Sequence, residues 1–167
     1  HLIVFWFLCH MAGLLIKKIK KTPLNYNLLG FFGIFLTIAY LSAGWYFAHH
    51  IYETSYHFET TKELPAASVR LVLIADSHLG VTMDGEDFSA EIERIRQTQP
   101  DIVVVGGDFV DDASHKSDMI QACKALGSLK TTYGVYFVFG NHDEGYSKES
   151  RDFSEDDLRK ELLANRV

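Results

Sequence analysis

The 167-residue sequence carries 22 acidic and 16 basic side chains, and its formal net charge of −6 is unevenly distributed. Residues 1–48 contain four lysines and no acid, whereas residues 49–167 carry the other 12 basic and all 22 acidic groups, for a net charge of −10. This acidic balance excludes nucleic acid as a partner, because binding to it depends on neutralising phosphates with basic side chains. The only two cysteines, Cys9 and Cys123, exclude a disulfide framework.

Two apolar segments at the start of the chain predict membrane-spanning helices. Residues 28–48 contain no charged side chain, and a helix of this length, at about 1.5 Å per residue, matches the roughly 30 Å core of a bilayer. A buried globular helix and a cleaved signal peptide are the alternatives, and the length of the run disfavours both. We therefore assign residues 1–21 to a first membrane segment with a basic loop, and residues 22–48 to a second transmembrane helix.

The basic loop at residues 17–23 predicts the orientation of the chain in the bilayer. Loops rich in lysine usually stay in the cytoplasm, so the second helix would emerge on the outer side. We therefore expect a protein of the cell membrane whose soluble part, after His49, is extracytoplasmic. The sequence begins at His1 and stops at Val167 just after a helical pattern, which we interpret as a fragment of a longer protein.

The soluble part begins with a linker and continues with strand patterns. Residues 49–68 are polar, and the alternation at residues 56–60 predicts a short strand. Three apolar runs rich in β-branched and aromatic residues follow, at 69–75, 102–105 and 135–139. Continuous apolar runs of this length are typical of strands covered on both faces.

Helical patterns follow each of the three predicted strands. Phe88, Ile92 and Ile95 recur at helical spacing after the first strand, and a similar stripe that contains Cys123 follows the second. A third helix is announced by a capping-box pattern that starts at Ser154. This alternation predicts an α/β fold for residues 69–167, with parallel strands and right-handed crossovers.

Each predicted strand ends in a polar cluster. Because ligands gather at the carboxyl ends of strands in an open parallel sheet, we expect the clusters to converge although about 30 residues separate them along the chain. The three clusters are Asp76-Ser77-His78, Gly106-Gly107-Asp108 and Gly140-Asn141-His142-Asp143.

The residue types in these clusters predict a metal centre. Asp76 and His78 are two positions apart, so both side chains can point to one side, and the carboxylate of Asp108 can bridge two cations. Asn141 offers a neutral oxygen. Mixed oxygen and nitrogen ligands suit Mn, Fe or Zn better than Ca. Taken singly, Asp108 and Asn141 could be ordinary turn residues beside glycines, but three evenly spaced clusters indicate a site.

Further polar side chains follow Asp108 in the sequence and could line the same pocket. We interpret them as a solvated acidic loop, since such loops usually lie on the surface. They are Asp111, Asp112, His115 and Asp118.

The three clusters resemble the first three sequence blocks of calcineurin-like metallophosphoesterases, in that family's order and spacing, and the bacterial membrane-anchored members in particular. The resemblance covers residues 69–167 and implies part of a four-layer α/β/β/α metallophosphoesterase fold around two divalent metal ions. It implies that Asp76 and His78 bind the first metal, that Asp108 bridges both and that Asn141 binds the second. It also implies that His142 lies over the substrate phosphate and that Asp143 orients His142.

The resemblance further implies that the intact protein is an enzyme, a metal-dependent phosphoric ester hydrolase. Its substrate would be a phosphate monoester or diester, attacked by a hydroxide held between the two metals, and the membrane anchor makes a lipid-linked substrate plausible. The family needs later histidines to complete both metals, and no histidine follows His142 here. We therefore expect the chain as given to be inactive. The alternative is a non-catalytic membrane receptor or scaffold domain that retains the fold, and His142, which has no duty as a metal ligand, argues against it.

Overall fold

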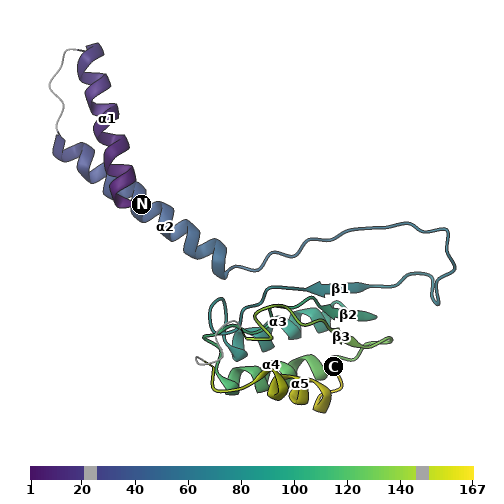
Figure 1. The fold of residues 1–167 in the computed structure, drawn as a ribbon. Helices are drawn as coiled ribbons and strands as arrows, with labels where there is room; N and C mark the ends of the chain where they lie inside the picture. Colours follow the sequence, from purple (N-terminus) through teal and green to yellow (C-terminus); the bar gives the residue numbers. More distant parts are fainter. Residues whose placement is uncertain (21–25, 146–150) are drawn as a thin grey trace. The chain divides into compact units, whose positions relative to one another are not determined.

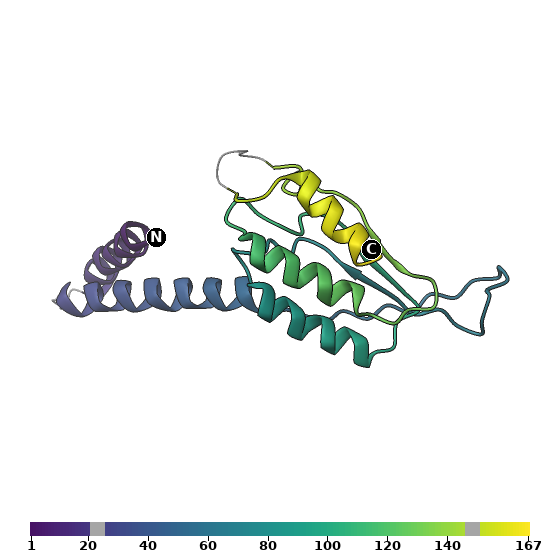
Figure 2. The same ribbon diagram turned by 90° about the horizontal axis from the view of Figure 1, so that it is seen from below.

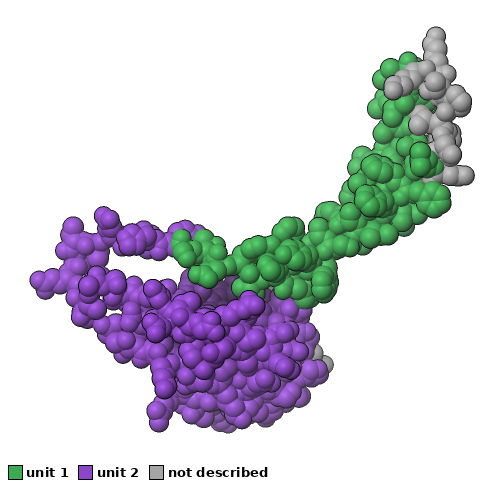
Figure 3. Space-filling view, turned by 180° about the vertical axis from the view of Figure 1, so that it is seen from behind, with its two compact units in different colours: residues 1–55 green, residues 56–167 purple. Residues whose placement is uncertain are grey.

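A computed structural model describes residues 1–20, 26–145 and 151–167, and the chain divides into two compact units, residues 1–55 and 56–167 (Figures 1 and 3). The first unit contains two helices, α1 (Leu2–Lys20) and α2 (Tyr26–His49). Both are long and apolar enough to cross a membrane, and only 11% of Leu2–Ile19 and 17% of Leu28–His49 are buried. A core helix of a soluble protein would be mostly buried, so the exposed apolar surface of these two helices agrees with the predicted membrane segments.

The two helices of the first unit approach closely at small residues. A Cβ atom at Gly30 would lie 2.9 Å from the ring of Trp6, and one at Gly33 would lie 3.4 Å from the Trp6 backbone. Small residues of this kind allow helices to pack in a membrane.

The prediction that residues 17–23 form a basic loop is wrong in its first part, because α1 continues through Lys20. Residues 21–23 lie outside the described residues.

Among its described residues, the second unit has a parallel three-stranded sheet with three helices beside it, and this confirms the predicted α/β class (Figure 2). The strands follow the sheet order β1-β2-β3, so that β2 lies in the centre. Their bounds and those of the helices, in chain order, are β1 (Leu71–Ile74), α3 (Gly85–Gln97), β2 (Ile102–Val105), α4 (Lys116–Gly127), β3 (Val135–Phe137) and α5 (Glu155–Ala164).

The core of the second unit lies between the sheet and the helices. Val103 and Val105 of β2 are fully buried there, together with Leu126 of α4 and Leu158 of α5. The opposite face of the sheet is apolar but exposed among the described residues. The prediction that the strands are covered on both faces therefore holds for one face only. Its large exposed side chains are Leu71, Leu73, Tyr136 and Val138.

Two local predictions differ in outcome. The capping box at the start of α5 is confirmed, because Ser154 accepts a hydrogen bond from the Asp157 backbone while Asp157 accepts one from the Ser154 backbone. The strand predicted at residues 56–60 is absent, although the structure describes this whole segment. Its side chains alternate as in a strand, but no neighbouring strand pairs with it here, and an unpaired strand is not stable.

Cys123 is fully buried on α4, as its apolar stripe predicts, and burial raises the pKa of its thiol from 9.0 to about 12. At pH values below 9.0 the reactive thiolate is therefore on the order of a thousandfold rarer than in an unfolded chain. In a Cys9→Ser variant, we expect iodoacetamide to label Cys123 about a thousandfold more slowly in folded than in urea-unfolded protein. Labelling within tenfold of the unfolded rate would contradict this burial.

The same shift fixes the sign of a pH effect on stability. The folded pKa of Cys123 lies above the unfolded value, so the contribution of the neutral thiol is fully present below pH 9.0 and is lost as the pH rises toward about 12. A Cys123→Ala variant has no thiol to ionise. Its free energy of unfolding, measured by circular dichroism, should accordingly fall less between neutral and alkaline pH than that of the wild type.

Candidate metal centre

The loops that follow β1 and β2 run side by side beyond the sheet. The backbone N–H of Asp76 donates to the Gly107 carbonyl at 3.1 Å, and the N–H of His78 donates to the Asp108 carbonyl at 3.0 Å. The hydroxyl of Ser77, a buried residue, donates to the Phe109 carbonyl at 3.1 Å. These bonds extend the parallel pairing past the strands, so the first and second polar clusters lie next to each other.

The three acidic and histidine positions in these loops share an unusual backbone conformation. Asp76, His78 and Asp108 have φ angles of 56°, 40° and 49°. A positive φ is uncommon for residues other than glycine, and such residues cluster at functional sites, where the surrounding structure holds them. Here the left-handed turns bend both loops sharply at the positions whose side chains are candidate ligands.

Two glycines allow the third cluster to contact the second. Gly107 has φ +91°, and a Cβ atom there would lie 2.7 Å from the Gly140 nitrogen. A Cβ atom at Gly140 would collide with the carboxylate of Asp108. Only glycine fits at both places, and the backbone N–H of His142 can then donate to Asp108 Oδ1 at 3.1 Å. The turn that carries Asn141 and His142 is thus held against the carboxylate of Asp108.

The donor set of the first two clusters fits a divalent metal ion. The candidate ligand atoms of Asp76, His78 and Asp108 all lie within 4.8 Å of one another. His78 Nε2 lies 4.0 Å from Asp76 Oδ1, while the other ring nitrogen, Nδ1, contacts Asp111. Two carboxylates and one imidazole nitrogen are ligands suited to Mn, Fe or Zn. Asn141, the fourth predicted ligand, is exposed in the neighbouring turn.

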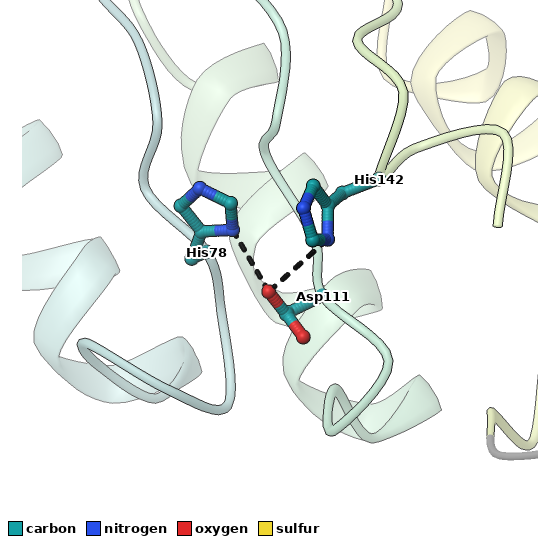
Figure 4. Close-up of side chains that lie close together, drawn as sticks. All are labelled: His78, Asp111 and His142. Carbon is teal, nitrogen blue, oxygen red and sulfur yellow. Dashed lines mark hydrogen bonds and ion pairs between the residues drawn. The ribbon is translucent and has the colours of Figure 1, made fainter. Parts of the chain in front are cut away.

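Asp111 joins the two histidines of the site (Figure 4). Its Oδ2 atom lies 2.8 Å from His78 Nδ1 and 3.3 Å from His142 Nδ1. The two imidazole rings are nearly perpendicular, with centroids 4.7 Å apart. A carboxylate on Nδ1 of His78 fixes the tautomer that leaves Nε2 available toward Asp76, and this is how carboxylates commonly support histidine ligands of metals.

The interpretation of Asp111 as part of a solvated loop is therefore wrong. Its side chain is only 18% exposed. Burial opposes its ionisation, but hydrogen bonds from His78 and from the Asp112 backbone, with the charges of His142 and His78, hold the pKa of Asp111 below its ordinary value. The sequence signal that could have identified it is its position three residues after Asp108, on the loop that leaves the same strand.

Asp143 does not have the contacts expected of a residue that orients His142. It is fully buried, and its carboxylate accepts hydrogen bonds from the backbone N–H groups of Phe109 at 2.9 Å, Val110 at 3.1 Å and Gly140 at 2.8 Å. Burial raises the pKa of this carboxyl; the three N–H groups oppose the shift, and the charge of Asp108 adds to it. Asp143 ties the third loop to the second, and the carboxylate beside the ring of His142 is that of Asp111.

Comparisons with known proteins point to the same region of the chain. The family model of the calcineurin-like phosphoesterases matches residues 69–166. A "transmembrane protein with metallophosphoesterase domain" from Danio rerio is 39% identical over 75 residues, which cover 45% of this chain and 17% of that protein. An "uncharacterized metallophosphoesterase" from Helicobacter pylori is 29% identical over 128 residues, covering 74% of this chain and 32% of that protein.

A third relative extends the match to a further bacterial protein. The "uncharacterized metallophosphoesterase YkuE" from Bacillus subtilis is 28% identical over 134 residues, covering 75% of this chain. The aligned part is 46% of YkuE. The chain thus spans less than half the length of each of these three relatives.

Proposed function

This chain belongs to the calcineurin-like phosphoesterase family, and we propose that it supplies the first part of a metal-dependent phosphoesterase site. One observation carries the proposal: residues from three strand ends meet, with Asp76, His78 and Asp108 grouped within 4.8 Å and the His142 turn bonded to Asp108. The helices α1 and α2 and the names of the relatives support a membrane-anchored enzyme.

In this proposal, four side chains hold two divalent cations, with Mn, Fe or Zn favoured by the mixed donors. Asp76 and His78 would hold the first cation, Asp108 would supply a ligand to both, and Asn141 would hold the second. When bound, the cations supply Lewis-acid activation of the attacking water and neutralise charge on the transferring phosphoryl group. The left-handed backbone at Asp76, His78 and Asp108 presents these ligands in a fixed arrangement before any ion arrives.

His142 acts on the leaving oxygen of the substrate. Its ring is 29% exposed and stands beside the metal ligands, so it can donate a proton or a hydrogen bond to a phosphate ester bound there. Asp111 Oδ2 lies 3.3 Å from Nδ1 of this ring, and this contact can hold the ring in its orientation. This assigns to Asp111 the orienting role that the family resemblance implies for Asp143.

We further propose that hydrolysis requires protein ligands in addition to those described here. Four ligands are few for two cations, since catalytic metals commonly keep three or more protein ligands each. The apolar outer face of the sheet, with Leu73 65% exposed, would be covered by the second sheet of a four-layer fold. By itself this chain would then hydrolyse phosphate esters slowly or not at all.

The membrane helices bear on the substrate and on location. Two helices long enough to span a bilayer would tether the soluble unit to a membrane. We propose a phosphate ester exposed there, with a lipid-linked ester as the favoured class, and an extracytoplasmic catalytic domain. The lysines at residues 17–21 support this orientation through the positive-inside tendency.

Hydrolysis of aryl phosphates tests the proposal. The complete gene product that contains this sequence is purified in detergent, stripped with EDTA and assayed on bis-p-nitrophenyl phosphate and p-nitrophenyl phosphate with added Mn²⁺. We expect hydrolysis that returns with Mn²⁺ and is far slower for residues 1–167 alone. Mn²⁺ binding without any turnover of either ester would instead favour the receptor or scaffold alternative, and the absence of Mn²⁺ binding would refute the metal centre.

A further inference from the structure

One arginine donates two hydrogen bonds to the backbone of the turn that carries His142. Arg151 Nη1 donates to the carbonyl oxygen of His142 at 2.9 Å, and Nη2 donates to that of Asp143 at 3.2 Å. Two parallel N–H groups of one guanidinium thus bind two successive carbonyls. A planar, always charged fork suits this geometry, whereas the single ammonium group of a lysine does not.

The guanidinium is itself held in place. Its carbon lies 4.8 Å from the ring centroid of Phe153, and Phe153 is a core residue that is only 7% exposed. The contact fixes the plane of the arginine side chain against the domain core. The position of Arg151 therefore depends on the core, and the position of the turn depends on Arg151.

The backbone of the turn leaves room for this arginine. Gly145 has φ +89°, and a Cβ atom there would lie 3.0 Å from Arg151 Nη2. The N–H of Gly145 also donates to the His142 carbonyl at 3.0 Å, so this oxygen accepts from both the turn and the arginine. A side chain at position 145 would press on the guanidinium as well as strain the backbone.

We propose that Arg151 is a positioning residue of the site, which fixes the His142–Asp143 turn and through it the imidazole of His142. The expected effect of Arg151 on turnover rests on the proposed function, whereas its expected effect on the order of the turn does not. The carbonyls of the turn are locked by Arg151 on one side, and the carboxylate of Asp143 is bonded to the loop after β2 on the other. Loss of the guanidinium frees one side only, so the fold persists while the ring of His142 loses its fixed direction.

The experiment compares Arg151→Ala with Arg159→Ala. Arg159 is a matched control, because it also stacks on a phenylalanine, with its guanidinium carbon 4.4 Å from the Phe139 ring, and pairs with Glu155 at 2.7 Å. We expect faster amide hydrogen exchange in the peptide spanning residues 140–145 for Arg151→Ala and unchanged exchange there for Arg159→Ala. This measurement needs neither metal nor substrate. Equal exchange in wild type and Arg151→Ala would overturn the proposal.

Turnover of the complete gene product provides the second measurement. We expect Arg151→Ala to lower kcat about tenfold with KM changed little, since positioning groups act in the transition state. Millimolar guanidinium should restore part of kcat, and tetramethylammonium at equal ionic strength should not. Should Arg151→Ala unfold, Arg151→Lys replaces it, with a smaller loss of kcat and weaker rescue expected. If the wild type is inactive but exchange is faster in Arg151→Ala, the proposed function alone is refuted. If the wild type is active and Arg151→Ala changes neither hydrogen exchange nor kcat, the role of Arg151 is refuted.

Discussion

Replacing Asp108 by asparagine is expected to lower the metal-dependent phosphoesterase activity of the complete gene product by about 100- to 1000-fold. Asparagine preserves the size of the side chain and one oxygen, so the close contact with Gly140 and the hydrogen bond from the His142 backbone can remain. What is lost is the negative charge and the second ligand oxygen. A metal ion that acts as a Lewis acid contributes several kcal/mol of transition-state stabilisation, and about 1.4 kcal/mol corresponds to a tenfold change in rate, so weaker metal binding accounts for a loss of this size.

The matched control for this variant is Asp87→Asn. Asp87 is an exposed aspartate in the first turn of α3, so the chemical change is the same but lies outside the candidate site. We expect its activity to stay within about twofold of wild type, as surface substitutions usually do. Mn²⁺ affinity, measured by calorimetry, should fall for Asp108→Asn only. A loss of activity below tenfold in Asp108→Asn would show that the assignment of the metal ligands is wrong.

Asp111→Asn is expected to lower kcat about 10- to 100-fold and to weaken Mn²⁺ binding at the same time. Asp111 accepts hydrogen bonds on both oxygens, from the Asp112 backbone at Oδ1 and from His78 at Oδ2, and His142 Nδ1 also lies next to Oδ2. Asparagine has only one acceptor oxygen, so its amide group would face a donor. The loss of His78 support weakens metal binding, and the loss of His142 support lowers kcat at saturating Mn²⁺.

Asp143→Asn is the informative comparison for Asp111→Asn. Asp143 accepts three backbone hydrogen bonds in a fully buried position, and an amide group there would oppose one of these N–H donors. A buried donor without an acceptor costs about 1–3 kcal/mol, so we expect Asp143→Asn to lower the melting temperature and Asp111→Asn to change it less. Unfolding must be followed by circular dichroism, because both tryptophans, Trp6 and Trp45, lie in the membrane helices. A stable Asp143→Asn that is inactive would return the orienting role to Asp143.

The sequence and the structure agree best where a pattern is local. The strand at residues 102–105 has the predicted bounds. The second transmembrane helix, assigned to residues 22–48 around the uncharged run at 28–48, extends over Tyr26–His49, and residues 22–25 lie outside the described residues. Each follows from side chains close together in the sequence: β-branched residues between turn residues, or an unbroken apolar run. The strand predicted at 56–60 is absent because a strand depends on a partner, which the segment's own alternation does not provide.

The amino-acid sequence by itself determined the class of the protein: apolar helices, alternating strands and helices, and ligand-type residues at three strand ends. These follow from periodicity and residue chemistry, which are properties of neighbours in the chain. Only the tertiary structure decided which carboxylate serves which partner, because Asp111 and Asp143 are equally acidic in the sequence and differ only in what the folded loops place around them. Asp111 meets two imidazoles, and despite its burial their hydrogen bond and charges help to hold its pKa below the ordinary value. Asp143 meets three backbone amides that lower its pKa, but its burial outweighs them and raises it.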